Sequence, residues 1–542
     1  MRPRDPSRVA SKSYDLLVIG GGIHGLTIAY DAASRGLRTA LVDRSDLGGE
    51  SSFNHQKTVH GGLRALHALS LRRAREGVRE RRAFARIAPW LLRPLPFLMG
   101  TYRSVRRGRL ALRAAFKLDA WIGRDRNDGV EPELHLPPAR LVSKAATLRL
   151  FPGIERKDLT GGAQWYDYQM VESDRLTIAF AAAADRAGAE IVNYVEAFAP
   201  IREGKRIAGM RIRDVVTGAE AEINAAVVVN AAGGQGGTVM RMLGVERPFP
   251  LLKAMNLVTA RPASDIALAA SVGDRMLTLV PWRGRALLGT GQSTTLAEPT
   301  DTGIAEHDIE ALIGRANNAF PALGLARADV TLVHHGLVPA VVGKDGRADL
   351  LPASQIFDHG HDGVTGALTV AGAKYTTARL TAERVVSRAG AKLGRRLAAA
   401  RTDLRRLPGA GIADHEALVI ETARAAGLEL RQETISRLIG HYAEHAAEIV
   451  RLMAADERLR EPLVGNSPAV AAEVSYVVRA EMAVRLTDIV VRRLGLGDAG
   501  HPGVAAVRAA AAIAARELSW DQARMETEIV AVDRLYSTPT AS

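Results

Sequence analysis

Three glycines and one acidic residue near the N-terminus have the types and spacing of a nucleotide-binding turn. Gly20, Gly22 and Gly25 follow the apolar run Leu16–Ile19, which predicts a buried parallel strand, and an alanine-rich helix comes next. The first glycine makes the tight bend, the second lets the backbone approach a pyrophosphate, and the third lets helix and strand pack closely. Asp43 ends the following strand and is placed to hydrogen-bond a ribose hydroxyl. The sequence predicts a dinucleotide site, with a glycine-rich turn that binds nothing as the alternative.

The composition restricts the chemistry that such a site could perform. The chain has 542 residues, enough for two or three domains, and contains no cysteine. Disulfides, iron–sulfur clusters, thiolate zinc sites and a cysteine redox relay are therefore excluded. We expect no metal site, and any redox chemistry belongs to a bound organic cofactor.

The charge of the chain is strongly positive and partly local. A net charge of +13 could favour nucleic acid, but no nucleic-acid motif accompanies it, so no nucleic-acid partner is expected. From Arg81 to Leu118 there is no acidic residue, and arginines alternate with bulky apolar side chains. This composition suits an anionic bilayer surface, with a solvated arginine-rich face as the alternative. The N-terminus lacks the apolar segment of a signal peptide, so we expect a cytoplasmic protein, either free or peripheral on the inner face of the cytoplasmic membrane.

The elements that must position the turn come from several separate segments of the chain. A helix from Asp174 leads to an apolar strand near residue 190, and a ribbon follows over residues 206–229. Residues 245–370 carry short strands with polar turns, and the chain returns to a helix after Thr377. From Leu418 to Tyr536 apolar residues recur at three- and four-residue spacing, which predicts helices. The stretch from residue 395 to 411 has the composition of a linker.

The chain resembles a known family over nearly its whole length. The matching segments are the N-terminal fingerprint, Lys57–Arg64, Asn230–Gly233, Pro281–Arg285, Leu288–Thr290, Ala373–Thr377 with Arg379 and Glu383, Ala472–Glu481, Asp488 and Arg492–Arg493. In this order they are similar to the aerobic, quinone-linked, FAD-dependent glycerol-3-phosphate dehydrogenases, a branch of the glutathione-reductase-type flavoproteins. An NAD enzyme is the alternative for the fingerprint alone, but a late motif helix that returns to the sheet is typical of flavoproteins.

The resemblance implies an α/β fold. It consists of a Rossmann-like FAD-binding domain of the glutathione-reductase type, a β-rich substrate or cap domain and a C-terminal all-α domain. We expect the FAD-dependent oxidoreductase region over residues 1–400. Its discontinuous FAD-binding domain would cover about 12–75, 150–240 and 360–395, and the helical domain 412–538. The resemblance also implies electron transfer to membrane quinone.

Glycine-rich turns elsewhere in the chain support FAD independently of the fingerprint. The turn His60–Gly62 lets backbone N–H groups approach an isoalloxazine ring, and the turn after Asn230 suits close approach to the dinucleotide. The turn before Lys374 leads into a helix whose N-terminus could stabilise negative charge on the flavin. We therefore predict the following cofactor-binding residues: Gly20, Gly22, Ile23, His24, Gly25, Asp43, Arg44, Ser51, Ser52, Lys57, Thr58, His60, Gly61, Gly62, Ala197, Ala231, Gly233, Gly372, Lys374, Tyr375 and Thr376.

The substrate pocket departs from the family pattern. In the family, arginines hold the phosphate of glycerol 3-phosphate, one of them in a Ser-Gly-Val-Arg-Pro-type segment. The corresponding segment here is His335–Pro339, with Val338 at the arginine position. A second family arginine falls near Ala353–Gln355, where there is none, and Ala65 replaces an aromatic residue. Arg64 and Lys374 remain, so the dehydrogenase scaffold is retained while the phosphate pocket is altered.

Alcohol oxidation by a flavin needs a base for the hydroxyl proton, while a hydride goes to flavin N5. The predicted catalytic residues are His60, Arg64, His335 and Lys374. His335 could instead be an ordinary strand histidine, and His60 a flavin-pocket residue. Three functions are consistent with these residues: oxidation of glycerol 3-phosphate to dihydroxyacetone phosphate in a rebuilt pocket, oxidation of another alcohol, hydroxy acid or amine, and flavin binding with poor catalysis. The electron acceptor, quinone or oxygen, and the oligomeric state, with a homodimer as one option, are left open by the sequence.

Overall fold

A computed structural model of the chain describes residues 1–10, 12–62, 70–103, 109–273, 275–410 and 414–537. The chain divides into two compact units. Unit 1 is built from residues 1–53, 172–251 and 338–535, and unit 2 from residues 54–171 and 252–337 together with the described C-terminal residues 536–537. Each unit draws on segments that are far apart in the sequence.

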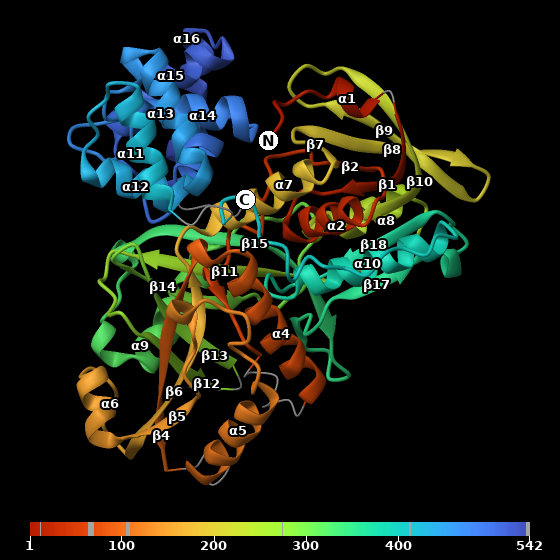
Figure 1. Cartoon of the computed structure of the whole chain (residues 1–542). Coiled ribbons are helices and arrows are strands. Elements are labelled where there is room, and N and C mark those ends of the chain that lie inside the picture. Colours follow the sequence, from red (N-terminus) through yellow and green to blue (C-terminus); the bar gives the residue numbers. More distant parts are fainter. Residues whose placement is uncertain (11, 63–69, 104–108, 274, 411–413, 538–542) are drawn as a thin grey trace. The chain divides into compact units, whose positions relative to one another are not determined.

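Unit 1 contains a sheet with the strand order β17-β18-β10-β1-β2-β7 (Figure 1). Its strands are β1 (Ser13–Ile19), β2 (Thr39–Val42), β7 (Glu190–Val192), β10 (Glu220–Asn230), β17 (Gln355–Asp358) and β18 (Ala367–Ala371). Neighbours from β18 to β7 run parallel, and β17 pairs with β18 antiparallel. The antiparallel strands β8 (Val195–Glu203) and β9 (Arg206–Asp214) extend from β10.

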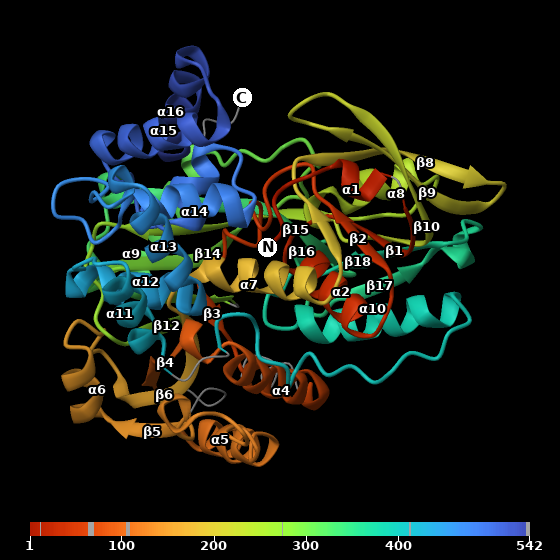
Figure 2. The same cartoon turned by 45° about the horizontal axis from the view of Figure 1, so that its top comes forward.

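Both faces of this sheet are buried, which explains the uninterrupted apolar run of β1. On one face, helix α2 (Ile23–Ser34) contacts α7 (Ser173–Arg186) and α10 (Ala378–Lys392), as Figures 1 and 2 show. On the other face, Leu17 and Ile19 join a core with residues of β8 and β9, α1 (Ser7–Ala10) and α8 (Gly236–Met242). Strands β1 and β2 end at the same edge, so the glycine turn and Asp43 come together there.

The C-terminal part of unit 1 is helical, as the sequence predicts. Its helices are α11 (His415–Ala425), α12 (Gln432–Tyr442), α13 (Ala446–Ala455), α14 (Ala471–Glu481), α15 (Val504–Leu518) and α16 (Gln522–Tyr536), drawn in blue shades in Figure 1. Helix α11 contacts α13, and α14 contacts α15. Between α14 and α15 lies a π-helical segment, Asp488–Arg493.

Unit 2 contributes most of a second sheet, which has the strand order β16-β15-β11-β14-β13-β12-β4-β6-β3, with β5 paired to β6. Its strands are β3 (Thr58–Val59), β4 (Leu92–Tyr102), β5 (Arg140–Ser143), β6 (Leu159–Met170), β11 (Leu251–Thr259), β12 (Ala267–Val272), β13 (Arg275–Trp282), β14 (Arg285–Gln292), β15 (Val330–Val342) and β16 (Ala348–Leu350). The helices of this unit are α4 (Leu71–Ile87), α5 (Arg109–Ile122), α6 (Lys144–Leu150) and α9 (Glu306–Ala319). The β-rich character predicted for this region is confirmed.

The basic and apolar stretch that begins at Arg81 is largely internal up to Leu98. Its leucines and phenylalanine on β4 are buried, and Arg81 pairs with the buried Asp167 at 2.6 Å. The apolar side chains that alternate with arginine in this part therefore belong to the core of unit 2. Among the described side chains of α5, Arg113, Lys117 and Leu118 are exposed, and so is Trp121 just beyond the stretch. In the described ranges, no helix has the length and hydropathy needed to cross a membrane.

Candidate functional site

The turn between β1 and α2 has geometry that only glycine allows at two positions. Gly20 has a φ of +107°, and a Cβ there would lie 2.6 Å from the carbonyl oxygen of Ala231. A Cβ on Gly25 would lie 1.8 Å from the carbonyl oxygen of Gly20. At Gly22 the nearest atom to a Cβ would be Ser52 Oγ at 3.1 Å. The turn is tight on its protein side, and Gly22 keeps the backbone accessible at the start of the helix.

The edge beside this turn holds a carboxylate and a hydroxyl in fixed positions. Asp43 accepts hydrogen bonds from the backbone N–H of Gly21 and from Ser45, whose N–H lies at 2.7 Å. Burial raises the pKa of Asp43 to about 6, although these hydrogen bonds lower it. Ser52 Oγ accepts the N–H of Ile23, the first residue of α2, at 2.9 Å. The chain thus presents helix N–H groups and an acid at one edge, as a nucleotide requires.

A second set of polar atoms lies beside Gly372, which follows β18. His24 Nε2 and Ser354 Oγ are buried and have no hydrogen-bond partner among the described residues. A Cβ on Gly372 would lie 2.4 Å from His24 Nε2 and 2.9 Å from Ser354 Oγ. Burial lowers the pKa of His24 to about 4, so the imidazole is neutral. Buried polar atoms without partners are costly, and a polar ligand beside the glycine turn would satisfy them. These residues fit the extended, polar FAD molecule.

In unit 2, the partly exposed His60 is hydrogen-bonded to the buried Asp167. Its Nδ1 lies 3.1 Å from Asp167 Oδ2, and its Nε2 lies 2.8 Å from Thr58 Oγ1. Asp167 also accepts the N–H of Gly61 at 2.7 Å and a guanidinium N–H of Arg81 at 2.6 Å. Burial opposes ionisation of Asp167, but the bond to His60 and the charge of Arg81 hold its pKa below the ordinary value. The network fixes the turn that carries His60 and Gly61.

A second network in unit 2 brings two histidines close to Asn54 and Lys57. His334 Nδ1 lies 2.9 Å from Asn54 Oδ1, and His55 Nδ1 accepts the N–H of Lys57 at 3.0 Å. Asn256 Nδ2 donates to the carbonyl of Asn54 at 3.0 Å. Burial lowers the pKa of His334 and of His55 well below the ordinary value, and the charge of Lys57 adds to the effect. Both imidazoles are therefore neutral near pH 7.

The other predicted site residues differ in their surroundings. Lys374 is exposed, and Tyr375 bonds Thr177 through its hydroxyl at 3.0 Å. His335 is partly buried next to His334, and successive residues of a strand point to opposite faces. Arg64 lies outside the described residues. The remaining predicted cofactor residues divide by exposure: Lys57, Thr58, Ala197, Ala231 and Thr376 are buried, Ser51 and Gly62 are partly buried, and Arg44 and Gly233 are exposed.

His334, Asn54 and Asn256 are not among the site residues that the sequence predicts. The only signal for them was the pair of adjacent histidines, and the sequence did not show which of the two faces Asn54. The contact joins residues 280 positions apart, which spacing along the chain does not reveal.

Comparison with known proteins agrees with this geometry. Residues 15–388 match the family model described as FAD dependent oxidoreductase, and residues 400–525 match the C-terminal domain of alpha-glycerophosphate oxidase. A solved structure of glycerol-3-phosphate dehydrogenase from Bacillus halodurans, complexed with FAD, has the same fold with a TM-score of 0.76. It is 23% identical and covers 98% of this chain and 96% of its own. The protein is an FAD-dependent oxidoreductase.

Two curated relatives identify the family more narrowly. Glycerol-3-phosphate dehydrogenase of Synechocystis is 30% identical over 513 residues, covering 91% of this chain and 90% of the relative. Glycerol-3-phosphate dehydrogenase 2 of Mycobacterium tuberculosis is 31% identical over 530 residues, covering 96% and 88%. The chain belongs to the FAD-dependent glycerol-3-phosphate dehydrogenase family. The predicted family, fold class and cofactor are confirmed.

Proposed function

We propose that the protein oxidises glycerol 3-phosphate to dihydroxyacetone phosphate, with His334 as the base that accepts the hydroxyl proton. The relatives' names supply the substrate. The observation that carries the proposal is the hydrogen bond between His334 Nδ1 and Asn54 Oδ1. Because the amide oxygen can only accept, Nδ1 carries the proton and Nε2 keeps its lone pair. FAD, when bound, supplies the acceptor for the substrate hydride.

The positive charge of Lys57 near His334 favours an anionic substrate. The low pKa of His334 reflects burial first, then Lys57, His55 and His335. A phosphate dianion nearby would raise the pKa of an imidazole and counter that effect. Lys57 is fully buried, with Nζ 5.8 Å from the centroid of the Trp282 ring. His60 has protein partners at both ring nitrogens, so we assign it the role of holding its turn.

The substrate test is bleaching of the yellow enzyme by glycerol 3-phosphate under anaerobic conditions. His334→Gln should lower kcat by about 10²–10⁴-fold, the range for loss of a general base. Lys344→Gln, on an exposed loop, is the matched control and should keep wild-type turnover. Normal kcat in His334→Gln would refute its role, and absence of bleaching in the wild type would refute the substrate.

A non-phosphorylated secondary alcohol is the second candidate, and Val338 favours it. This partly buried aliphatic residue stands where the family pattern has an arginine. If this candidate is right, glycerol 3-phosphate will show a high KM with little inhibition by phosphate. Val338→Arg would then raise kcat/KM for glycerol 3-phosphate by about 10–100-fold, as expected from a regained charge-assisted bond of about 1.5–3 kcal/mol. Micromolar KM in the wild type would rule this candidate out.

We further propose that quinone accepts the electrons and that the protein binds the inner face of the cytoplasmic membrane through α5. The exposed face of this helix carries Arg113, Lys117, Leu118 and Trp121. Basic and aromatic side chains together suit an anionic bilayer. Co-sedimentation with anionic vesicles should weaken as salt rises and in Trp121→Ser, whereas Val216→Ser, on an exposed turn of unit 1, should bind as the wild type does. Equal binding to neutral and anionic vesicles would contradict the proposal.

A further inference from the structure

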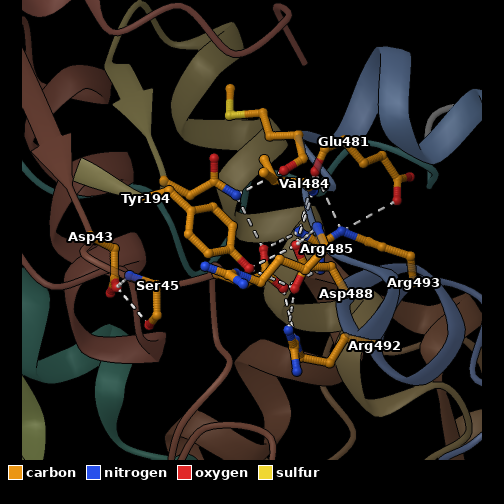
Figure 3. Close-up of polar contacts among 12 residues, drawn as sticks. Asp43, Ser45, Tyr194, Glu481, Val484, Arg485, Asp488, Arg492 and Arg493 are labelled. Carbon is orange, nitrogen blue, oxygen red and sulfur yellow. Dashed lines mark hydrogen bonds and ion pairs between the residues drawn. The ribbon is translucent and has the colours of Figure 1, made fainter. Parts of the chain in front are cut away.

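A buried charge network joins the C-terminal helices of unit 1 to the loop that follows β2 (Figure 3). Six of its members carry charge: Asp46, Glu481, Asp488, Arg175, Arg492 and Arg493. Three acids face three arginines, so the network is neutral as a whole. Removal of any one charge would leave a buried partner uncompensated, which is costly.

The centre of the network is Asp46, which lies three residues after Asp43. Arg492 Nε donates to Asp46 Oδ2 at 2.8 Å. Arg493 donates to both carboxylate oxygens, at 2.9 and 2.7 Å. Burial opposes ionisation of Asp46, but the two guanidinium charges hold its pKa below the ordinary value. The two arginines lie 446 and 447 positions from Asp46 in the sequence, so the bonds connect opposite ends of the chain.

A second set of contacts reaches the same loop from Asn193 and Tyr194, which lie between β7 and β8. Tyr194 donates its hydroxyl to Asp488 at 2.8 Å, and its N–H bonds the carbonyl of Ser45 at 3.2 Å. Arg492 also donates from Nη2 to Asp488 Oδ1. Asn193 bridges Asp46 and the carbonyl of Met482, at 3.2 and 2.8 Å. The loop is therefore held at both Ser45 and Asp46.

This loop in turn supports the nucleotide turn. The N–H of Gly48 donates to the carbonyl of Gly21 at 2.9 Å, and the N–H of Gly21 donates to Asp43. A Cβ on Gly21 would lie 2.8 Å from the Leu47 side chain. Ser45, held by Tyr194, donates its own N–H to Asp43. The orientation of the Asp43 carboxylate thus depends on a loop whose position is set by the C-terminal region.

We infer that Arg492 and Arg493 are positioning residues for FAD, because they hold the loop that orients Asp43 toward the adenosine ribose. The inference rests on the prediction that Asp43 binds the ribose. Binding that requires an ordered loop is stronger when other contacts have already ordered it. By linkage, bound FAD must stabilise the contact between the loop and the C-terminal helices to the same degree.

The test measures FAD release from the holoenzyme, followed as the rise in flavin fluorescence after dilution. Arg492→Lys keeps the charge, but a single ammonium cannot bridge Asp46 and Asp488 as the guanidinium does. Loss of one charge-assisted bond predicts release that is about tenfold faster or more. The matched control is Arg479→Lys, which breaks a bidentate pair with Glu517 between α14 and α15, at 2.7 Å for each bond. Release from the control should stay within about twofold of the wild type.

The outcomes separate this inference from its premise. If Asp43→Asn speeds FAD release but Arg492→Lys and Arg493→Lys do not, the positioning role is wrong. If both arginine variants speed release and Asp43→Asn does not, the loop acts on FAD without the ribose contact. Hydrogen exchange gives a readout that a purely structural role would not change. FAD should protect residues 471–493 in the wild type and less so in Arg492→Lys, and equal protection in both would overturn the inference.

Discussion

Replacement of Asp167 by asparagine should destabilise unit 2 strongly. The Arg81 and Asp167 side chains are only 8% and 4% exposed, so solvent screens their interaction little. An amide cannot balance the Arg81 charge, and it loses acceptor capacity toward Gly61 and His60. Breaking a buried ion pair in this way costs about 3–5 kcal/mol. We expect the unfolding free energy of unit 2 to fall by that amount.

Urea denaturation followed by tryptophan fluorescence is suited to this measurement, because four of the five tryptophans lie in unit 2. The control is Glu306→Gln, which breaks a partly exposed pair with Arg327 in the same unit and should cost at most about 1 kcal/mol. The pKa of Asp167 is lowered by folding, so its contribution is present above the unfolded value of about 3.9 and is lost as pH falls through the folded pKa. A loss below about 1 kcal/mol, or an unchanged acid limb in the variant, would refute the reasoning.

Three further predictions concern the cofactor edge. Gly22→Val should leave the apoprotein folded, because its Cβ would meet only the Ser52 side chain, whose Oγ at 3.1 Å would have to shift slightly. It should abolish FAD binding, and a yellow variant would contradict this. Gly25→Ala should lower Tm sharply, because its Cβ would lie 1.8 Å from the carbonyl oxygen of Gly20, and calorimetry that finds wild-type stability would disprove the contact. The pKa of Asp43 is raised to about 6, so FAD affinity should rise from pH 5 to 7 as the carboxylate ionises, a dependence that fluorescence titration of Asp43→Asn should not show.

The parts of the fold that the sequence predicts are those with local signals. The apolar run of β1, the three glycines and helix α2 lie within 22 consecutive residues. In each of them, the residue types have a local physical reason. The helical tail shows its own periodicity, and the structure has α11–α16 there. The bounds of the three predicted domains and the predicted site residues stay predictions.

What the sequence could not predict depends on long-range contacts. Arg81 resembles any other arginine of a basic stretch until Asp167 on β6 comes beside it. His334 and His335 are adjacent on β15 and therefore point to opposite faces of the sheet. Which face each one takes decides which of them contacts Asn54. The sequence shows Arg492–Arg493 only as part of a family pattern, since their partner Asp46 is distant in the chain. The charge of such residues is visible in the sequence, but their partners are not.

The choice of charges over apolar side chains at the loop after β2 has a physical consequence. An apolar contact there would stabilise the C-terminal helices against the loop in many orientations, because burial is not directional. The bidentate bonds of Arg493 and the bridge of Arg492 between Asp46 and Asp488 are satisfied in one arrangement only. A network that gains little net stability can therefore still fix where Asp43 points. A change of all six charged residues to well-packed apolar ones should preserve unfolding free energy yet speed FAD release, whereas slow release in that variant would show that packing alone orients the loop.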